Sequence, residues 1–382
     1  MRIVHCLSMC LVLVPVGMPI ADPLPLSSAT CSEQTAENLL GLPPVPGDSS
    51  PDHLTEKVQL GKTLFFDKRL SADGSISCAS CHHPEQGFID GLPRAQGLHR
   101  QLGTRNTPTL INAVFAQTQF WDGRRDSLET QATDPLFNPI EHGLRDEAQL
   151  LHVIRQDDHY VAAFEKAFAV PPETLTVAHV AQSIAAYERT LVAGNSAFDR
   201  YLYGHDKTAL DAAALRGLEL FRGRAQCGQC HVIGQTSALF TDQQFHTLGV
   251  GLKRLEDRLA PEAVRFAQLT AAERQQRVLS DPDLAELGRF SVTLKPTDLG
   301  RFRTPSLRNV AETAPYMHDG SVATLEEAVD LEVYYRGVEA GHPLILTPSE
   351  KNDLVAFLKA LTSPRFKQRA ECESAPPQQN RG

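Results

Sequence analysis

Methionine is scarce in this chain, which has only four methionines among 382 residues. Met1, Met9 and Met18 stand within the first 18 residues, so Met317 is the one thioether in the rest of the sequence. A metal site that depends on a methionine ligand is therefore excluded almost everywhere in the chain. Tryptophan is scarcer still, because Trp121 is the only one.

An excess of positive charge is also lacking. Lys and Arg total 37 against 46 for Asp and Glu, which gives a formal net charge of -9. Nucleic acid is therefore a poor partner, since no basic surplus exists to neutralise phosphates. The remaining composition, 42% hydrophobic and 22% charged, is that of an ordinary globular protein and excludes wholesale disorder.

Long apolar runs are absent after the first residues. Arg2 and an apolar stretch over 7–21, interrupted by Pro15 and Pro19, are typical of an export signal. We expect a signal peptide over 1–21, with cleavage as late as 29, and a mature protein in the periplasm with no membrane span. A retained N-terminal anchor is the alternative, although the stretch is short for a bilayer.

The eight cysteines divide into three groups. Cys6 and Cys10 belong to the expected signal, and Cys31 and Cys372 stand near the two mature ends. In an oxidising compartment this last pair can form a disulfide, or both can remain unpaired. The other four lie in two C-x-x-C-H motifs, which end at His82 and His231.

The C-x-x-C-H motifs, Cys78 to His82 and Cys227 to His231, predict covalent attachment of two c-type haems. Each motif supplies two thiols for thioether bonds, at Cys78 and Cys81 and at Cys227 and Cys230. The following histidine then binds the iron from one side. A zinc site or a pair of disulfides is the alternative, but neither explains a histidine directly after the second cysteine in both motifs.

The chain is expected to be mainly α-helical and divided in two. The same G-x-x-L-F pattern, at 61–65 and 217–221, precedes both haem motifs and indicates an internal duplication. Apolar residues recur at helical spacing and strand signals are few. We expect two cytochrome c-like haem domains with long loops, whose haems face the domain interface. The expected segments are a lead-in over 22–53, an N-terminal domain over 54–200, a C-terminal domain over 201–365 and a tail over 366–382. A charged insertion of unassigned role covers 253–281.

Between and after the motifs, the sequence resembles the bacterial dihaem cytochrome c peroxidase and MauG superfamily over about 55–362. The resemblance is carried by RNTPT (105–109), QFWDGR (119–124), NPIE (138–141), FHTLGVG (245–251), RTPSLRN (303–309) and APYMHDGS (314–321). It implies that the N-terminal haem reacts with peroxide and that the C-terminal haem transfers electrons.

The resemblance also assigns roles to individual residues. Glu141 matches the glutamate that moves a proton between the peroxide oxygens, and Trp121 matches a tryptophan placed between the haems. His99 lies in the loop that carries a distal, displaceable iron ligand. A calcium ion is implied between the domains, with Asn106 as a side-chain ligand and the carbonyls of Thr313 and Pro315 as the others. For each side chain the structural alternative is a surface or core residue.

The sequence departs from the peroxidases at the second haem. A methionine is expected fourteen residues after His318, where this chain has Glu332. Glu332 or an exogenous ligand can be the sixth iron ligand, and Tyr334 or Tyr335 are the alternatives. An oxygen ligand favours higher oxidation states, which suggests a MauG-like bis-ferryl state. His142, which follows Glu141 where methionine is frequent, is expected to add a proton donor near peroxide or to be a solvent-facing histidine.

Three functions therefore remain open. The first is a periplasmic peroxidase that reduces hydrogen peroxide with electrons from a small cytochrome c or a copper protein. The second is a MauG-like oxidase that modifies residues of a partner protein. The third is a dihaem electron carrier without catalysis, which requires neither Glu141 nor Trp121. The resemblance also implies a homodimer.

Overall fold

The computed structural model describes residues 39–46, 54–339 and 341–366. The expected signal peptide, most of the lead-in and tail, and both Cys31 and Cys372 lie outside the described residues. Within the described part of the chain, no helix combines the length and the apolar character needed to cross a membrane.

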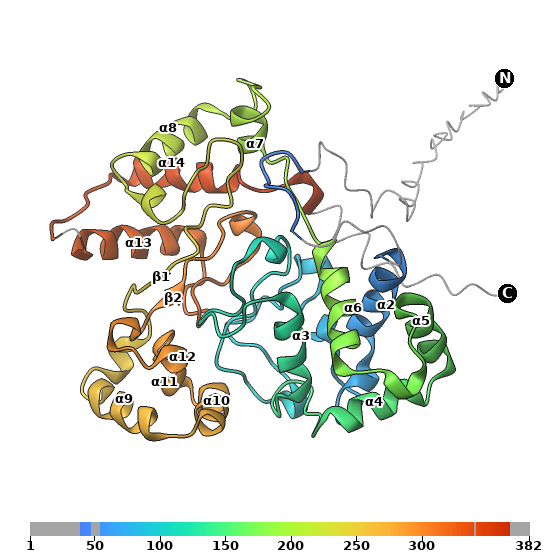
Figure 1. Ribbon diagram of the computed structural model, residues 1–382. Coiled ribbons are helices and arrows are strands. Elements are labelled where there is room, and N and C mark those ends of the chain that lie inside the picture. The colour runs from blue at the N-terminus through green and yellow to red at the C-terminus, as the bar shows by residue number, and fades with distance from the viewer. Residues whose placement is uncertain (1–38, 47–53, 340, 367–382) are drawn as a thin grey trace, which may run out of the picture.

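The described residues are mainly helical, as the periodicity predicts, with long loops between the helices (Figure 1). The helices of the N-terminal half are α2 (Leu54–Phe66), α3 (Leu128–Phe137), α4 (Glu147–Arg155), α5 (Asp158–Phe168) and α6 (Val177–Arg189). Those that follow are α7 (Ala197–Leu202), α8 (Ala212–Arg222), α9 (Leu259–Gln268), α10 (Ala271–Ser280), α11 (Pro282–Ala285), α12 (Phe290–Thr293), α13 (Leu325–Glu339) and α14 (Pro348–Lys359). Strands β1 (Phe245–His246) and β2 (Phe302–Arg303) pair antiparallel.

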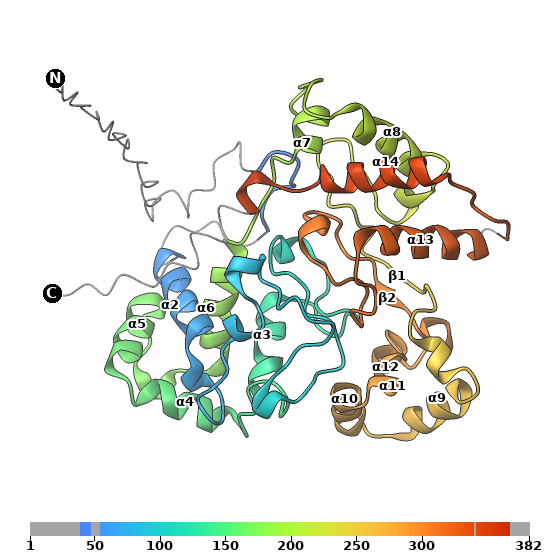
Figure 2. The same ribbon diagram turned by 180° about the vertical axis from the view of Figure 1, so that it is seen from behind.

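The two halves repeat one helix-packing arrangement. In the N-terminal half α2 packs along α6, and in the C-terminal half α8 packs along α14 (Figures 1 and 2). A Cβ on Gly61 of α2 would lie 1.8 Å from the carbonyl oxygen of Ser183, and one on Gly217 of α8 would lie 2.0 Å from that of Asp353. Glycine is thus required at the same place in both pairs, because any side chain there would separate the helices.

The phenylalanine of each G-x-x-L-F pattern lies at the centre of its half. Phe65 and Phe221 are 0% and 1% exposed and contact other aromatic rings edge-on, Phe65 with Tyr187 and Phe221 with Phe240. The repeated sequence pattern therefore has a common structural cause. The expected boundary near 200 stays a prediction, although Phe198 packs with the core of the C-terminal half.

The insertion at 253–281 folds into helices α9 and α10, which together with α11 and α12 form a separate group of short helices (Figures 1 and 2). This group has its own core, in which Phe266 and Leu287 are almost fully buried. It is tied to the N-terminal half, because Thr104 Oγ1 donates to the carbonyl oxygen of Val278 at 2.9 Å. The insertion therefore lies against loops that follow the first haem motif.

Candidate haem and peroxide site

Both C-x-x-C-H motifs fold into the same turn. Cys78–Ser80 and Cys227–Gln229 each form one turn of 3₁₀ helix. The backbone N–H of His82 then donates to the carbonyl oxygen of Cys78 at 2.9 Å, and that of His231 to Cys227 at 3.0 Å. Each turn brings the two cysteines and the histidine together.

The two histidines are oriented by equivalent hydrogen bonds. The Nδ1 atom of His82 lies 3.0 Å from the carbonyl oxygen of Phe88, and Nδ1 of His231 lies 2.8 Å from that of Phe240. A carbonyl oxygen only accepts, so Nδ1 carries the proton and Nε2 is left to bind iron. Burial lowers the pKa of both imidazoles, that of His231 to about 4, which keeps the rings neutral as ligation requires.

One continuous cavity of about 440 Å³ joins the two motifs. Cys81 and His82 line it from the N-terminal half, and Cys227, Cys230 and His231 line it from the C-terminal half. Trp121 lies on the same wall. This arrangement places both predicted haem sites at the junction of the halves, as the fold prediction states.

Three arginines on the cavity wall indicate whether the cavity suits the charged groups of haem. Arg105, Arg124 and Arg303 all line the cavity, and each has a buried side-chain nitrogen without a hydrogen-bond partner. Burial also lowers the pKa of Arg105 and Arg303, because it takes their charge out of water. An anion beside these guanidinium groups would compensate this desolvation cost. Haem carries two propionate carboxylates, which are acceptors of the required charge. The donor set therefore fits two haems.

None of the four motif cysteines takes part in a disulfide bond. Burial raises the pKa of Cys81 and Cys227 to about 12, and that of Cys78 further. Such thiols are protonated at neutral pH.

Glu141 lies on the cavity wall, where its carboxylate is held by a neighbour in its own loop. Asn138 Nδ2 donates to Glu141 Oε1 at 2.6 Å, and Asn138 Oδ1 accepts from the backbone N–H of Ile140 at 3.0 Å. Burial raises the pKa of the Glu141 carboxyl group above its usual value, while the charge of Arg124 and the Asn138 hydrogen bond oppose the rise. A carboxyl group whose pKa is raised in this way is suited to taking up and releasing a proton.

The loop of His99 is attached to the loop of Glu141. The backbone N–H of Leu98 donates to the carbonyl oxygen of Ile140 at 2.8 Å, and a Cβ on Gly97 would lie 2.0 Å from the same oxygen. The side chain of His99 is 72% exposed, and its Nδ1 lies 3.7 Å from a carboxylate oxygen of Asp73. His99 is not among the residues that line the cavity, so the described conformation has its ring outside the site.

His142 is buried and does not face solvent. Its ring is 3% exposed, and its Nδ1 lies 2.8 Å from the carbonyl oxygen of Leu70. The residue is neither on the cavity wall nor in solvent, because its backbone hydrogen bonds to Ala72 and Pro135 turn it into the N-terminal half. This burial corrects the solvent-facing alternative, while a role as proton donor near peroxide stays a prediction.

Trp121 and Asn106 connect the halves at the cavity. Trp121 Nε1 donates to the carbonyl oxygen of Asn106 at 3.0 Å, and the backbone N–H of Asn106 donates to the carbonyl oxygen of His318 at 2.9 Å. The carbonyl oxygen of Trp121 accepts from the N–H of Arg303 on β2 at 2.9 Å. Trp121 is thus hydrogen-bonded to backbone on both sides of the junction.

The residues expected to bind calcium all lie on the cavity wall. Asn106, Thr313 and Pro315 line the same cavity. Asn106 Nδ2 donates to the carbonyl oxygen of Leu92 at 3.0 Å, so the carboxamide oxygen is the atom suited to a cation. Calcium at this place stays a prediction.

The structure separates the candidates for the sixth ligand of the second haem. Glu332 of α13 lines the cavity, together with Arg336 one turn later. Arg336 Nη1 lies 3.8 Å from the sulfur of Cys230. Tyr334 is 64% exposed and, like Tyr335, is not on the cavity wall. The helix register therefore favours Glu332 over either tyrosine.

Two residues that support the site carry no motif signal of their own, Asn138 beside Glu141 and Glu286 beside His318. Glu286 is 1% exposed and lies 2.7 Å from Nε2 of His318, whose ring stacks on Phe302. Glu286 follows the insertion by only a few residues. Its pairing with His318 joins positions 32 apart, so local sequence pattern carries no signal of it.

Comparisons with known proteins agree with this geometry. The family model described as di-haem cytochrome c peroxidase matches residues 55–207. Cytochrome-c peroxidase IdrP1 of Pseudomonas sp. is 38% identical over 339 residues, which cover 85% of each chain. Methylamine utilization protein MauG of Methylorubrum extorquens is 36% identical over 83% of this chain and 81% of that protein.

A crystal structure of a MauG-like protein associated with microbial copper homeostasis superposes with a TM-score of 0.66 at 31% identity. The superposition covers 93% of this chain and 99% of the other. The expected fold, mainly helical with two cytochrome c-like haem domains, is confirmed by these relatives. The chain therefore belongs to the family of di-haem cytochrome c peroxidases.

Proposed function

We propose that this protein is a periplasmic peroxidase that reduces hydrogen peroxide to two water molecules with two electrons and two protons. The observation that carries the proposal is the placement of the Glu141 carboxylate. It lies on the wall of the cavity that also contains the His82 imidazole, and Asn138 holds it there. An electron carrier has no use for a half-buried, oriented carboxylate at this point.

The residues of the chain divide the reaction between them. When bound, haem supplies the redox chemistry of O–O cleavage. Glu141 takes a proton from one oxygen of peroxide and delivers it to the other, which makes the departing oxygen a water molecule. Asn138 fixes Oε1 for this transfer, and the raised pKa of Glu141 allows the group both to accept and to donate the proton.

Trp121 provides the connection between the two halves. Its indole is fixed by Asn106, and its backbone is fixed by Arg303 of the C-terminal half. An aromatic ring held rigidly between two redox sites shortens the gap that an electron must cross. We assign to Trp121 the passage of electrons from the His231 site to the His82 site.

The finer expectations belong to the same proposal. The four motif cysteines attach the two haems covalently, and Asn106, Thr313 and Pro315 bind calcium. The electron donor is a small cytochrome c or a copper protein, and the enzyme works as a homodimer. His99 is the displaceable ligand, and the described conformation, with its ring outside the cavity, corresponds to the open site.

The test is steady-state consumption of hydrogen peroxide by the haem-loaded enzyme with a pre-reduced small cytochrome c. The proposal predicts that two cytochromes are oxidised for each peroxide consumed. Peroxide consumption that needs no donor, or a donor that stays reduced, contradicts it. Adding dithionite to one sample and none to another shows whether the first turnover requires reductive activation.

A second candidate function, oxidation of residues on a partner protein as in MauG, rests on Glu332. This carboxylate lines the cavity near the second motif, at the position where the peroxidases have methionine. An anionic oxygen ligand lowers the reduction potential and favours storage of oxidising equivalents on the two haems. A fully ferric sample that reacts with one equivalent of peroxide and gives a long-lived near-infrared band would support this function. A sample that reacts only after partial reduction would support the peroxidase.

A further inference from the structure

A second cavity, of about 310 Å³, adjoins the haem cavity at Glu141. Five residues line both cavities, so the two spaces meet at a shared wall. The shared residues are Phe120, Arg124, Asn138, Glu141 and Leu279. Glu147 and Gln275, both exposed to solvent, also line the second cavity. The cavity thus extends from the surface to the carboxylate proposed to be catalytic.

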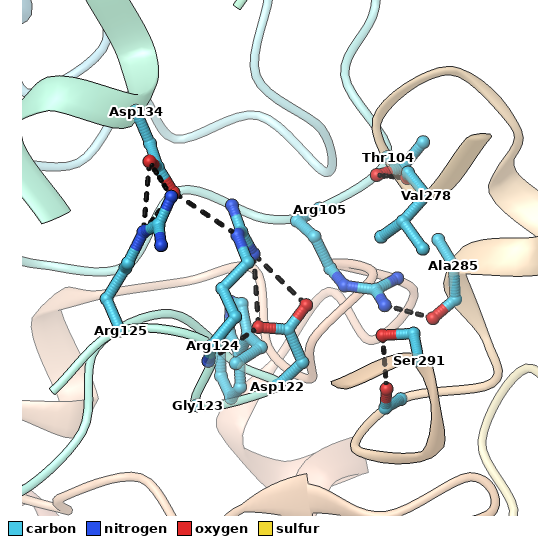
Figure 3. Close-up of polar contacts among 12 residues, drawn as sticks. Thr104, Arg105, Asp122, Gly123, Arg124, Arg125, Asp134, Val278, Ala285 and Ser291 are labelled. Atoms are coloured by element: carbon cyan, nitrogen blue, oxygen red, sulfur yellow. Dashed lines mark hydrogen bonds and ion pairs between the residues drawn. The ribbon is translucent and has the colours of Figure 1, made fainter. Parts of the chain in front are cut away.

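One wall of this second cavity comes from the insertion. Gln275 and Leu279 are four residues apart on α10, so both project from one face of the helix toward the N-terminal half. The end of α10 is held in place, because Thr104 Oγ1 donates to the carbonyl oxygen of Val278, which is buried (Figure 3). Arg105 reinforces the attachment by donating to the carbonyl oxygen of Ala285.

The charges along the opposite wall are paired. Arg125 Nη2 lies 2.6 Å from Asp134, and Arg124 Nη1 lies 3.0 Å from Asp122 (Figure 3). The Nε atom of Arg124 lies 3.7 Å from Asp134 as well. Both arginines are thus paired with aspartates, and the other charged residues that line the cavity, Glu141 and Glu147, are acidic. The route therefore disfavours anions and admits a small neutral polar molecule. Hydrogen peroxide and organic hydroperoxides are neutral and hydrogen-bonding at neutral pH.

The remaining wall is apolar and the space is large. Phe120, Phe137, Val177 and Leu279 contribute side chains to it. A water molecule occupies about 30 Å³ in the liquid. The second cavity therefore has room for a peroxide with a small hydrocarbon group as well as for hydrogen peroxide. Leu279 lines both cavities, as Glu141 does, and therefore stands where the two spaces meet.

We propose that this second cavity is the route by which peroxide reaches Glu141, and that Leu279 of the insertion decides between hydrogen peroxide and organic hydroperoxides. The proposal rests on the peroxidase function above. For an organic hydroperoxide the O–O bond breaks, two electrons come from the small redox-protein donor and two protons are taken up. The products are one alcohol and one water. Glu141 transfers the proton in both cases.

The experiment compares second-order rate constants for hydrogen peroxide and tert-butyl hydroperoxide in the haem-loaded, full-length enzyme. Leu279→Ala is expected to raise the ratio of kcat/KM for the organic over the inorganic peroxide about tenfold, the effect of a few methylenes in a pocket. Leu279→Trp is expected to lower kcat/KM for both, with kcat at saturation and the haem absorption spectrum preserved. Gln275→Trp places a large side chain at the solvent-exposed part of the second cavity. It should narrow the entrance to that cavity without disturbing the protein core.

Val264→Trp is the matched control, since Val264 lies on α9 of the same insertion, is 60% exposed and lines neither cavity. It should leave both rate constants unchanged. If the wild type, Leu279→Ala and Gln275→Trp have the same rate constant for each peroxide, the proposed route is wrong. The peroxidase function would still stand in that case. Absence of peroxide turnover in the wild type itself would instead overturn the proposed function.

Discussion

The indole N–H of Trp121 and the backbone carbonyl oxygen of Asn106 are joined by a hydrogen bond of 3.0 Å at the wall between the two haem motifs. The N–H of the same Asn106 residue donates to His318 in the C-terminal half. The tryptophan proposed to pass electrons and the asparagine proposed to bind calcium are therefore one connected unit. Displacing either residue must move the other.

Trp121→Phe tests this connection. The substitution keeps an aromatic ring but removes the N–H donor, which leaves the Asn106 carbonyl oxygen without its partner. We expect the free energy of unfolding to fall by about 1–3 kcal/mol and the electron transfer between the two haems to slow. Chemical denaturation and stopped-flow absorbance measure the two effects. If the Trp121→Phe protein is less stable but its electron transfer is unchanged, Trp121 has a structural role only.

Asn138→Ala tests the tuning of Glu141. The hydrogen bond from Asn138 lowers the pKa of Glu141 and so opposes the effect of burial, and its removal must raise the pKa further. Proton abstraction needs the carboxylate, so kcat/KM rises as the pH rises through this pKa. In the wild type the midpoint is expected above 4.5, the ordinary value for glutamate. In Asn138→Ala it should lie at still higher pH, and a shift toward lower pH would contradict the assignment.

Glu332→Met tests the sixth ligand of the second haem. A thioether in place of a carboxylate stabilises ferrous iron, so the reduction potential of this haem should rise. Spectroelectrochemistry of the purified dihaem protein measures it. Tyr335→Phe is the control, because Tyr335 does not line the cavity and the substitution should leave the potential unchanged. If Tyr335→Phe shifts the potential and Glu332→Met does not, the assignment is reversed.

Asp199→Asn tests the buried ion pair that supports the C-terminal half. Arg308 Nη1 lies 2.9 Å from Asp199 Oδ2, and the two side chains are 2% and 0% exposed. Removing one charge leaves the other buried without compensation, which costs about 3–5 kcal/mol of stability. The exposed pair between Lys359 and Glu326, at 3.4 Å, should contribute about 0–1 kcal/mol. Urea unfolding of Asp199→Asn and Glu326→Gln compares the two pairs.

The sequence predicts local features of this protein well. The two turns around His82 and His231 follow from their motifs, and the repeated glycines mark the same helix contact in both halves. The sequence pattern does not predict which way each side chain of a loop points. His142 follows Glu141 directly, yet its ring turns to Leu70 while Glu141 faces the cavity.

Contacts between distant segments are the other part that the sequence does not predict. The insertion at 253–281 has an ordinary charged, helical composition, and nothing in it indicates that Leu279 meets Glu141 at a shared wall. Arg303 and Arg124 are separated by many residues, yet both bring a buried nitrogen without a hydrogen-bond partner to one cavity. Such groupings arise from tertiary packing, and the spacing of residues within one segment does not predict them.

The central claim is that Glu141 is the proton-transfer group of a peroxidase, and Glu141→Gln tests it most directly. The amide preserves the size of the side chain but cannot act as a base. Steady-state reduction of hydrogen peroxide by a reduced cytochrome c should fall by about 10²- to 10⁴-fold, with both haems retained. Glu165→Gln, at an exposed position on α5, should keep full activity. Full activity in Glu141→Gln, with its haem content unchanged, would contradict the account.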